Sequence, residues 1–124
     1  MAKTKLIIAG NRNFKSYYFV LDQFSQYLDY LEETKPNNKF ILVNGLATGV
    51  DALAYKIAKA NNMKIKEFPA DWDKHPRAAG PIRNAQMADY ATELLAIWDH
   101  KSKGTKNMIE QMQQRNKPVK IVRI

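Results

Sequence analysis

Residues 39–51, Lys-Phe-Ile-Leu-Val-Asn-Gly-Leu-Ala-Thr-Gly-Val-Asp, contain a strand, a loop and the start of a helix. The run Lys39–Val43 is almost entirely apolar, which is typical of a strand buried on both faces of a parallel sheet. Thr48, with Asp51 three residues later, resembles a capping box that opens a helix. We expect this helix to run to about Asn62. The stretch therefore predicts one strand–loop–helix unit of an α/β protein.

The same alternation of strands and helices continues on both sides of this unit. Apolar runs predict further strands at Lys5–Gly10, Met63–Phe68, Glu93–Trp98 and Pro118–Arg123. Amphipathic spacing predicts further helices at Ser16–Thr34, Pro81–Tyr90 and Thr105–Arg115. Right-handed crossovers then give an α/β fold, a Rossmann-like doubly wound sheet of about five parallel strands with helices on both faces. We expect residues 1–124 to form a single domain.

Composition and charge exclude several classes of protein. There is no cysteine, so disulfides, thiol nucleophiles and thiolate metal sites are excluded. The apolar run near the start is too short for a signal peptide or a membrane span, so we expect a cytoplasmic protein with no membrane partner. The net charge of +8 is concentrated in residues 101–124, which carry seven Lys or Arg and one acid. Such a region attracts nucleic acid or a phosphorylated small molecule, although composition alone favours a simple solvated surface.

Special residues gather directly after the predicted strands. In an open doubly wound sheet, ligands bind beyond the carboxyl ends of the strands, where the strand order reverses. Residues 10–14, 44–51, 69–84 and 98–105 occupy those positions, and each segment combines Gly or Pro with charged or hydrogen-bonding side chains. Segment 69–84 is the most informative, because it is long, polar and ends at Pro81, the expected first residue of a helix. The sequence therefore predicts an anion-binding site at this edge of the sheet.

The motifs in these segments resemble a known family. They read Gly10-x-Arg12-x-Phe14, Asn44-Gly45-x-x-x-Gly49-Val-Asp51, Phe68-Pro-Ala-Asp-Trp72, Ala79-Gly-Pro-x-Arg-Asn84 and Trp98-Asp99-x-x-Ser102-x-Gly104-Thr105. In this order, across nearly the whole chain, they resemble the YspA (YpsA-related) branch of the SLOG superfamily. The resemblance implies a Rossmann-like fold that binds nucleotides or nucleotide-derived ligands, and it favours a homo-oligomer. Relatives include the lonely-guy phosphoribohydrolases, which cut the N-glycosidic bond of nucleoside monophosphates, and the single-stranded-DNA-binding DprA/Smf proteins.

The sequence departs from these patterns at two places. Lonely-guy enzymes have Pro-Gly-Gly-x-Gly-Thr-x-x-Glu, whose Glu is essential, and here Gly104 and Thr105 match but the Glu position is Met108. Glu110 lies about 200° further around the helix and cannot replace it. In residues 44–48 the branch usually has a second glycine and a basic residue, and this chain has neither. The resemblance therefore implies that the loops that hold the ligand are retained and that the catalytic acid of the lonely-guy enzymes is not. Enzymatic activity is left open.

The residues expected to hold the ligand come from these motifs and loops. They are Gly10, Arg12, Asn13, Phe14, Asn44, Gly45, Thr48, Gly49, Asp51, Asp71, Trp72, Gly80, Arg83, Asn84, Ser102, Gly104 and Thr105. Arg12 and Arg83 are expected to grip phosphate through their guanidinium forks, or else to pair with an acid such as Asp71, Asp73 or Asp99. Trp72 either stacks on a base or packs in the core, and core packing is favoured. No spacing indicates a metal site, and we expect no cofactor.

Three functions remain open at this stage. The favoured one is a module that binds a nucleotide-derived small molecule and keeps it intact, as a sensor or by sequestering it. The second is an N-glycosidic hydrolase or transferase, which needs a carboxylate to stabilise a ribosyl cation or to activate water. Asp99, at a strand end, is the expected catalytic residue in that case. The third is single-stranded DNA binding by residues 101–124, which would depend steeply on salt.

Overall fold

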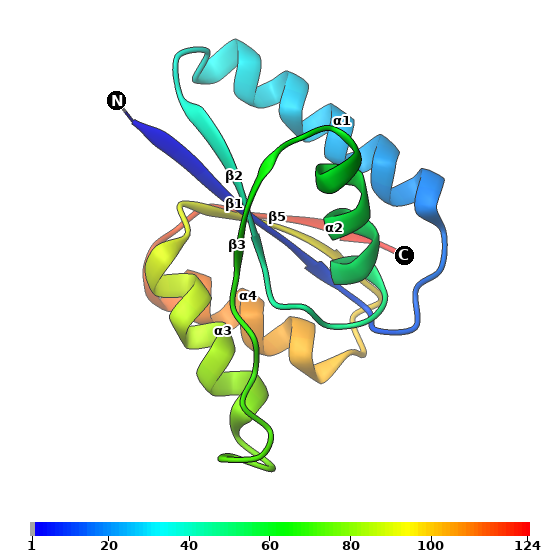
Figure 1. Cartoon of the computed structure of the whole chain (residues 1–124), viewed down its shortest axis with the longest axis vertical. Helices are drawn as coiled ribbons and strands as arrows, with labels where there is room; N and C mark the ends of the chain where they lie inside the picture. Colours follow the sequence, from blue (N-terminus) through cyan, green and yellow to red (C-terminus); the bar gives the residue numbers. More distant parts are fainter. Residues whose placement is uncertain (1) are drawn as a thin grey trace.

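The computed structural model describes residues 2–124, and in it a five-stranded parallel sheet lies between two layers of helices (Figure 1). The strands are β1 (Lys3–Gly10), β2 (Lys39–Asn44), β3 (Lys64–Glu67), β4 (Glu93–Trp98) and β5 (Val119–Arg123). The helices are α1 (Tyr17–Thr34), α2 (Val50–Ala60), α3 (Ala79–Tyr90) and α4 (Lys103–Gln114). The predicted Rossmann-like α/β sheet is therefore confirmed. Within residues 2–124, no helix combines the length and apolar character needed to cross a membrane.

The strand order places a topological switch point at the centre of the sheet. The order is β3-β2-β1-β4-β5, so the chain builds outward from β1 to β3 and then returns to lay β4 against the other side of β1. Gly10 at the end of β1 pairs with Ile97 near the end of β4. The loops that follow these two strands start side by side and lead to helices on opposite faces. Ligands bind at such a point in open α/β sheets.

Side-chain alternation explains why the middle of β1 is apolar at consecutive positions. Leu6 and Ile8 of β1 pack with α1 and α2 in one buried cluster. Ile7 and Ala9 of the same strand pack with α3 and α4 in a second cluster. Because helices cover both faces, residues 6–9 of β1 all meet an apolar layer and no polar face is required there.

Three predicted helix starts differ from the structure, and α4 begins at Lys103 rather than at Thr105. α2 begins at Val50 after Gly49, whose positive φ of 73° suits glycine, and no side chain caps the helix. Thr48 and Asp51 therefore do not form the expected capping box. α3 begins at Ala79, two residues before Pro81, so Pro81 is not its first residue. A proline is tolerated there because the N–H groups of the first turn have no partner within the helix.

A buried carboxylate, Glu93, ties together the end of the sheet opposite the switch point, and its cationic partner Lys35 is exposed. The carboxylate of Glu93, which is 1% exposed, accepts hydrogen bonds from Tyr27 Oη at 2.8 Å, Lys35 Nζ at 2.9 Å and Thr92 Oγ1 at 3.0 Å. Burial, together with the hydrogen bond to Glu93, raises the pKa of Tyr27 above its usual range. The three donors come from α1, its C-terminal end and the loop before β4, so the carboxylate ties the helix to the sheet.

We expect Glu93→Gln to lower the free energy of unfolding by about 1–3 kcal/mol, because the amide loses the ion pair and cannot accept all three hydrogen bonds. Urea denaturation measures this change. Asp89→Asn is the control, since Asp89 pairs with Arg115 at 2.7 Å on the surface and 72% of its side chain is exposed. Such a pair contributes about 0–1 kcal/mol. Equal losses in the two variants would contradict a special role for Glu93.

Candidate ligand-binding site

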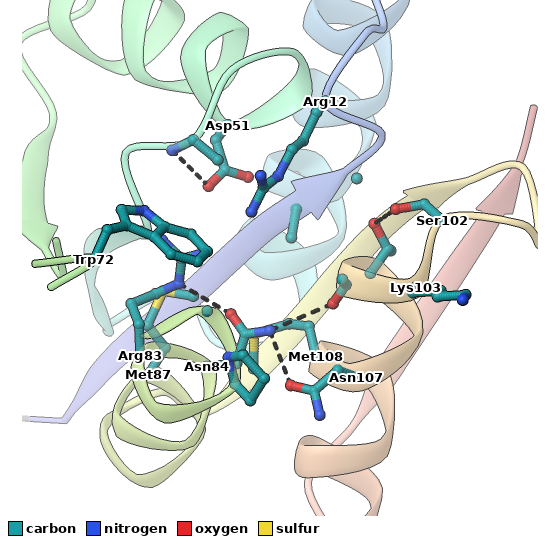
Figure 2. Close-up of a pocket in the computed structure, with 17 residues that line it drawn as sticks. Arg12, Asp51, Trp72, Arg83, Asn84, Met87, Ser102, Lys103, Asn107 and Met108 are labelled. Atoms are coloured by element: carbon teal, nitrogen blue, oxygen red, sulfur yellow. Dashed lines mark hydrogen bonds between the residues drawn. The ribbon is translucent and has the colours of Figure 1, made fainter. Parts of the chain in front are cut away.

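A cavity of about 260 Å³ opens at the switch point, between the carboxyl ends of β1 and β4 and the first turns of α3 and α4 (Figure 2). Its walls include residues from the segments that follow β1, β2, β3 and β4. The predicted site residues that line it are Gly10, Arg12, Asp51, Trp72, Gly80, Arg83, Asn84, Ser102, Gly104 and Thr105. Four loops that are far apart in the sequence therefore converge on one hollow.

Two further hollows adjoin this cavity. One of about 340 Å³ adds Gly45 and Thr48 to the predicted residues that line the site. Another, of about 540 Å³, adds Asn13 and also contacts Thr48. Arg12 lines all three hollows and so lies where they meet.

The other predicted site residues do not line these three hollows. Phe14 packs edge-on against Phe19, with ring centroids 5.6 Å apart. Asn44 donates to the Asp51 carbonyl at 2.9 Å, and Gly49 lets the backbone of Asn11 approach closely. Asp71 accepts a hydrogen bond from the Lys74 backbone at 3.1 Å and lines another hollow, of about 150 Å³. These residues shape the loops rather than face the cavity.

Asp99, the expected catalytic residue, is engaged with its own loop. Its Oδ1 accepts hydrogen bonds from the backbone N–H groups of Lys101 at 2.8 Å and Ser102 at 2.9 Å. These two donors lower the pKa of Asp99 below its usual range. The carboxylate thus builds the turn that leads from β4 into α4. Among residues 2–124, the acid that lines the 260 Å³ cavity is Asp51 instead.

Arg83 is a buried arginine that joins α3 to the loop between β2 and α2. Its Nη1 donates to the Gly45 carbonyl, and its Nε donates to Asn84 Oδ1 at 3.0 Å. A Cβ on Gly45 would lie 2.7 Å from Nη1, so the glycine makes room for the guanidinium. The alternative partners Asp71, Asp73 and Asp99 are not used: the carboxylate that attracts Arg83 is that of Asp51. Two of its five N–H groups serve these hydrogen bonds, and the side chain also lines the cavity.

Asp51 is a buried carboxyl group that is influenced by the charges of Arg83 and Arg12. Its Oδ2 accepts a hydrogen bond from the Ala47 backbone at 3.3 Å. Burial raises the pKa of Asp51 to about 6, although the Arg83 guanidinium, the Ala47 N–H and Arg12 act in the opposite direction. The loss of hydration therefore outweighs these favourable contacts, and the carboxyl group exchanges its proton close to neutral pH.

This raised pKa predicts a pH dependence of stability. Between the unfolded pKa of 3.8 and the folded pKa of about 6, the folded state binds more protons than the unfolded state. The stability that Asp51 contributes is therefore complete below pH 4 and lost as the pH rises to about 6. We expect the free energy of unfolding of the parent, minus that of Asp51→Asn, to fall by about 1–3 kcal/mol over this range. Urea titrations at several pH values measure the difference, and a flat difference would contradict the assignment.

Trp72 and Arg12 meet across the cleft, as Figure 2 shows. The guanidinium carbon of Arg12 lies 5.8 Å from the centroid of the Trp72 ring. Trp72 is 46% exposed, so the expectation that it packs in the core is wrong. Its segment lies beyond β3 and before α3, outside both apolar clusters, and the ring edge rests near Gly80. The tryptophan instead forms a wall of the site.

The first turn of α4 closes the other side of the cavity. Ser102 precedes the helix, and its hydroxyl lies 3.2 Å from Thr105 Oγ1 without capping a backbone N–H. Asn84 Nδ2 donates to the Gly104 carbonyl at 3.3 Å and so fixes α3 against this turn. Lys103 also lines the cavity. The N–H groups of a helix start, together with a lysine, make this end of the site electropositive.

Sequence reasoning missed several residues that line the cavity. They are Ala9, Ala47, Pro81, Met87, Asn107 and Met108. Helical spacing gives a signal for some of them, because Asn107 and Met108 lie one turn after Gly104 and so share its face. Asn107 Oδ1 accepts from Asn84 Nδ2 at 3.0 Å, which the sequence alone does not indicate. Met108 is buried and gives the cavity an apolar floor.

Comparisons with known proteins agree with this architecture. The model of the YspA, cpYpsA-related SLOG family matches residues 4–75. No curated protein matches the chain. Among solved structures, DNA processing protein A (DprA) from Streptococcus pneumoniae is similar, with a TM-score of 0.72 and 18% sequence identity. The match covers 96% of this chain but 50% of that protein, so this chain spans half its length and the likeness concerns the fold.

Proposed function

The chain belongs to the YspA, cpYpsA-related SLOG family, and we propose that it binds a phosphate-bearing nucleotide or nucleotide-derived small molecule at the switch point. The role would be that of a sensor or a sequestering module. The observation that carries the proposal is the convergence of Arg12, Arg83 and the first turn of α4 on one cavity. Cations and backbone N–H groups arranged in this way are suited to an anionic ligand.

The phosphate is expected between Arg12 and α4. Arg12 is exposed, and its contact with Trp72 leaves the N–H groups of its guanidinium available. The 540 Å³ hollow joins Arg12 to Ser102 and Gly104 and is otherwise lined by Asn11, Asn13 and Thr48. No acid lines this hollow, whereas Asp51 would repel a phosphate placed deeper, beside Arg83. Charge therefore favours the outer position.

Gly104 supports this placement and supplies a prediction. A Cβ at this position would meet nothing within 4 Å, so packing does not explain the glycine. Gly104→Ala should keep or raise the free energy of unfolding, by up to about 1 kcal/mol, because alanine is the better helix former. It should weaken pyrophosphate binding about tenfold, because a methyl group at the helix start hinders close approach to the N–H groups.

Calorimetry of pyrophosphate binding and urea denaturation measure the two effects of Gly104→Ala. Gly80→Ala is the matched control, since Gly80 also lies in the first turn of a helix that lines the cavity. A Cβ on Gly80 would be in ordinary contact with Trp72, at 3.5 Å. We expect the control to change pyrophosphate affinity less than twofold. Equal losses of affinity in both variants would argue against phosphate at α4.

The ligand can be identified by incubating the protein with a panel of nucleotides, NAD-derived species and cyclic nucleotides. Bound and free fractions are then separated and analysed by liquid chromatography and mass spectrometry. A compound retained intact would support the binding module, and no retained compound would contradict it. Binding to oligonucleotides that weakens steeply with salt would instead favour single-stranded DNA as the partner.

Release of a free base with a ribose phosphate would favour the second candidate, N-glycosidic hydrolysis. The observation in its favour is Asp51, a buried carboxyl group that lines the cavity and has a pKa of about 6. A group that titrates near neutral pH is suited to proton transfer. In that case Asp51→Asn should stop turnover while binding persists, and Asp99→Asn should not.

A further inference from the structure

A second hollow with different walls adjoins the main cavity. Its volume is about 340 Å³, and it shares Arg12, Ala47, Trp72 and Arg83 with the cavity. The remaining walls are Gly45, Leu46, Thr48, Pro69 and Ala70. Apart from the two shared arginines, no charged residue lines it. The walls that this hollow does not share with the cavity are therefore uncharged, whereas a lysine, hydroxyl groups and helix N–H groups lie at α4.

Two large apolar side chains in this hollow are not buried by the fold. Trp72 is 46% exposed and Leu46 is 44% exposed, although the central strands of the sheet bury their apolar residues almost completely. Large apolar surface held open at a concave site is typical of a position where a ligand supplies the missing contact.

The backbone at Leu46 adds a separate observation. Leu46 has a φ of 60°, in the left-handed region that glycine adopts at no cost and leucine only with strain. Its N–H donates to Asn44 Oδ1 at 2.8 Å, which holds this conformation. Glycine adopts this φ without the steric strain, so the local backbone conformation does not account for a leucine at this position.

We propose that a flat aromatic heterocycle of the nucleobase class binds in this second hollow, against Trp72 and Leu46. The inference rests on the proposed function and adds the direction in which the ligand lies across the site. Because Arg12 lines all three hollows, it lies between the heterocycle in the second hollow and the phosphates that extend to α4. A base has a flat π face that stacks on tryptophan, and its neutral edge requires no charged partner.

The test compares probes with and without a base. The affinities of ADP, GDP, CDP and UDP and of inorganic pyrophosphate are measured by calorimetry for the parent, Trp72→Leu and Leu46→Gly. Leu46→Gly removes the side chain and relieves the backbone strain, so this variant should fold at least as well as the parent. Tyr18→Ala is the control, since Tyr18 is 79% exposed on α1 and lines none of these hollows.

We expect at least one nucleoside diphosphate to bind more tightly than pyrophosphate. Its affinity should fall about tenfold in Trp72→Leu and about threefold in Leu46→Gly, while pyrophosphate affinity changes less than twofold. The same diphosphate should quench tryptophan fluorescence in the parent but not in Trp72→Leu, which retains Trp98.

Two other outcomes would overturn the inference in different ways. If pyrophosphate binds as tightly as every diphosphate, or if both probes weaken equally in both variants, the base does not occupy this hollow and the phosphate site stands. If neither pyrophosphate nor any diphosphate binds to the parent, the proposed function fails together with the inference.

Discussion

Replacing Arg83 with methionine should lower the free energy of unfolding by about 3–5 kcal/mol. The methionine fills most of the volume of the arginine but leaves the Gly45 carbonyl and Asn84 Oδ1 without their donor. It also removes the positive charge that attracts the buried Asp51. Each unsatisfied buried acceptor costs about 1–3 kcal/mol, and an uncompensated buried charge costs more.

Urea denaturation at pH 7 measures this loss, and Arg12→Met is the matched control. Arg12 is exposed and its guanidinium lies over the Trp72 ring, so its replacement should change the free energy of unfolding by less than about 1 kcal/mol. Because Asp51 becomes neutral at low pH, part of the loss in Arg83→Met should be recovered below pH 6. Losses of similar size in the two variants would show that Arg83 does not anchor the site.

The fold could be predicted from the sequence because its signals are local. The apolar runs that become β1, β2 and β4 are continuous, and helices between parallel strands leave few topologies open. For loop residues, the sequence indicates less clearly which side chains are buried. Trp72 was expected in the core because large aromatic residues usually are, but its segment lies beyond the sheet edge where no apolar layer reaches it.

Roles within the site could be predicted only in part, because a side chain's partners depend on the tertiary structure. Both arginines were expected to bind phosphate, yet the sequence does not show that Arg83 faces a backbone carbonyl 38 residues away. It also does not show that Asp99 is engaged by the N–H groups of its own turn while Asp51 lines the cavity. Residue type and loop position identified the candidate site residues. Their burial in the structure distinguishes those that support the loops from those that face the ligand.

Arg12→Met should have the opposite effect to Arg83→Met: nearly unchanged stability and a large loss of ligand binding. A charge-assisted hydrogen bond to phosphate contributes about 1.5–3 kcal/mol, so we expect pyrophosphate affinity to fall about 10- to 150-fold. Calorimetry at constant ionic strength measures the change. Lys101→Met is the control, since Lys101 is an exposed cation near α4 that lines none of the three hollows.

Comparing Arg12→Met with Lys101→Met separates a specific phosphate contact from a general effect of positive charge. Removing Lys101 lowers the overall charge equally, so a matching loss of affinity in both variants would indicate diffuse attraction rather than a site at Arg12. A loss confined to Arg12→Met, with unfolding unchanged, would place the phosphate where the three hollows meet. The buried arginine would then be the one that holds the loops in place, and the exposed arginine the one that holds the ligand.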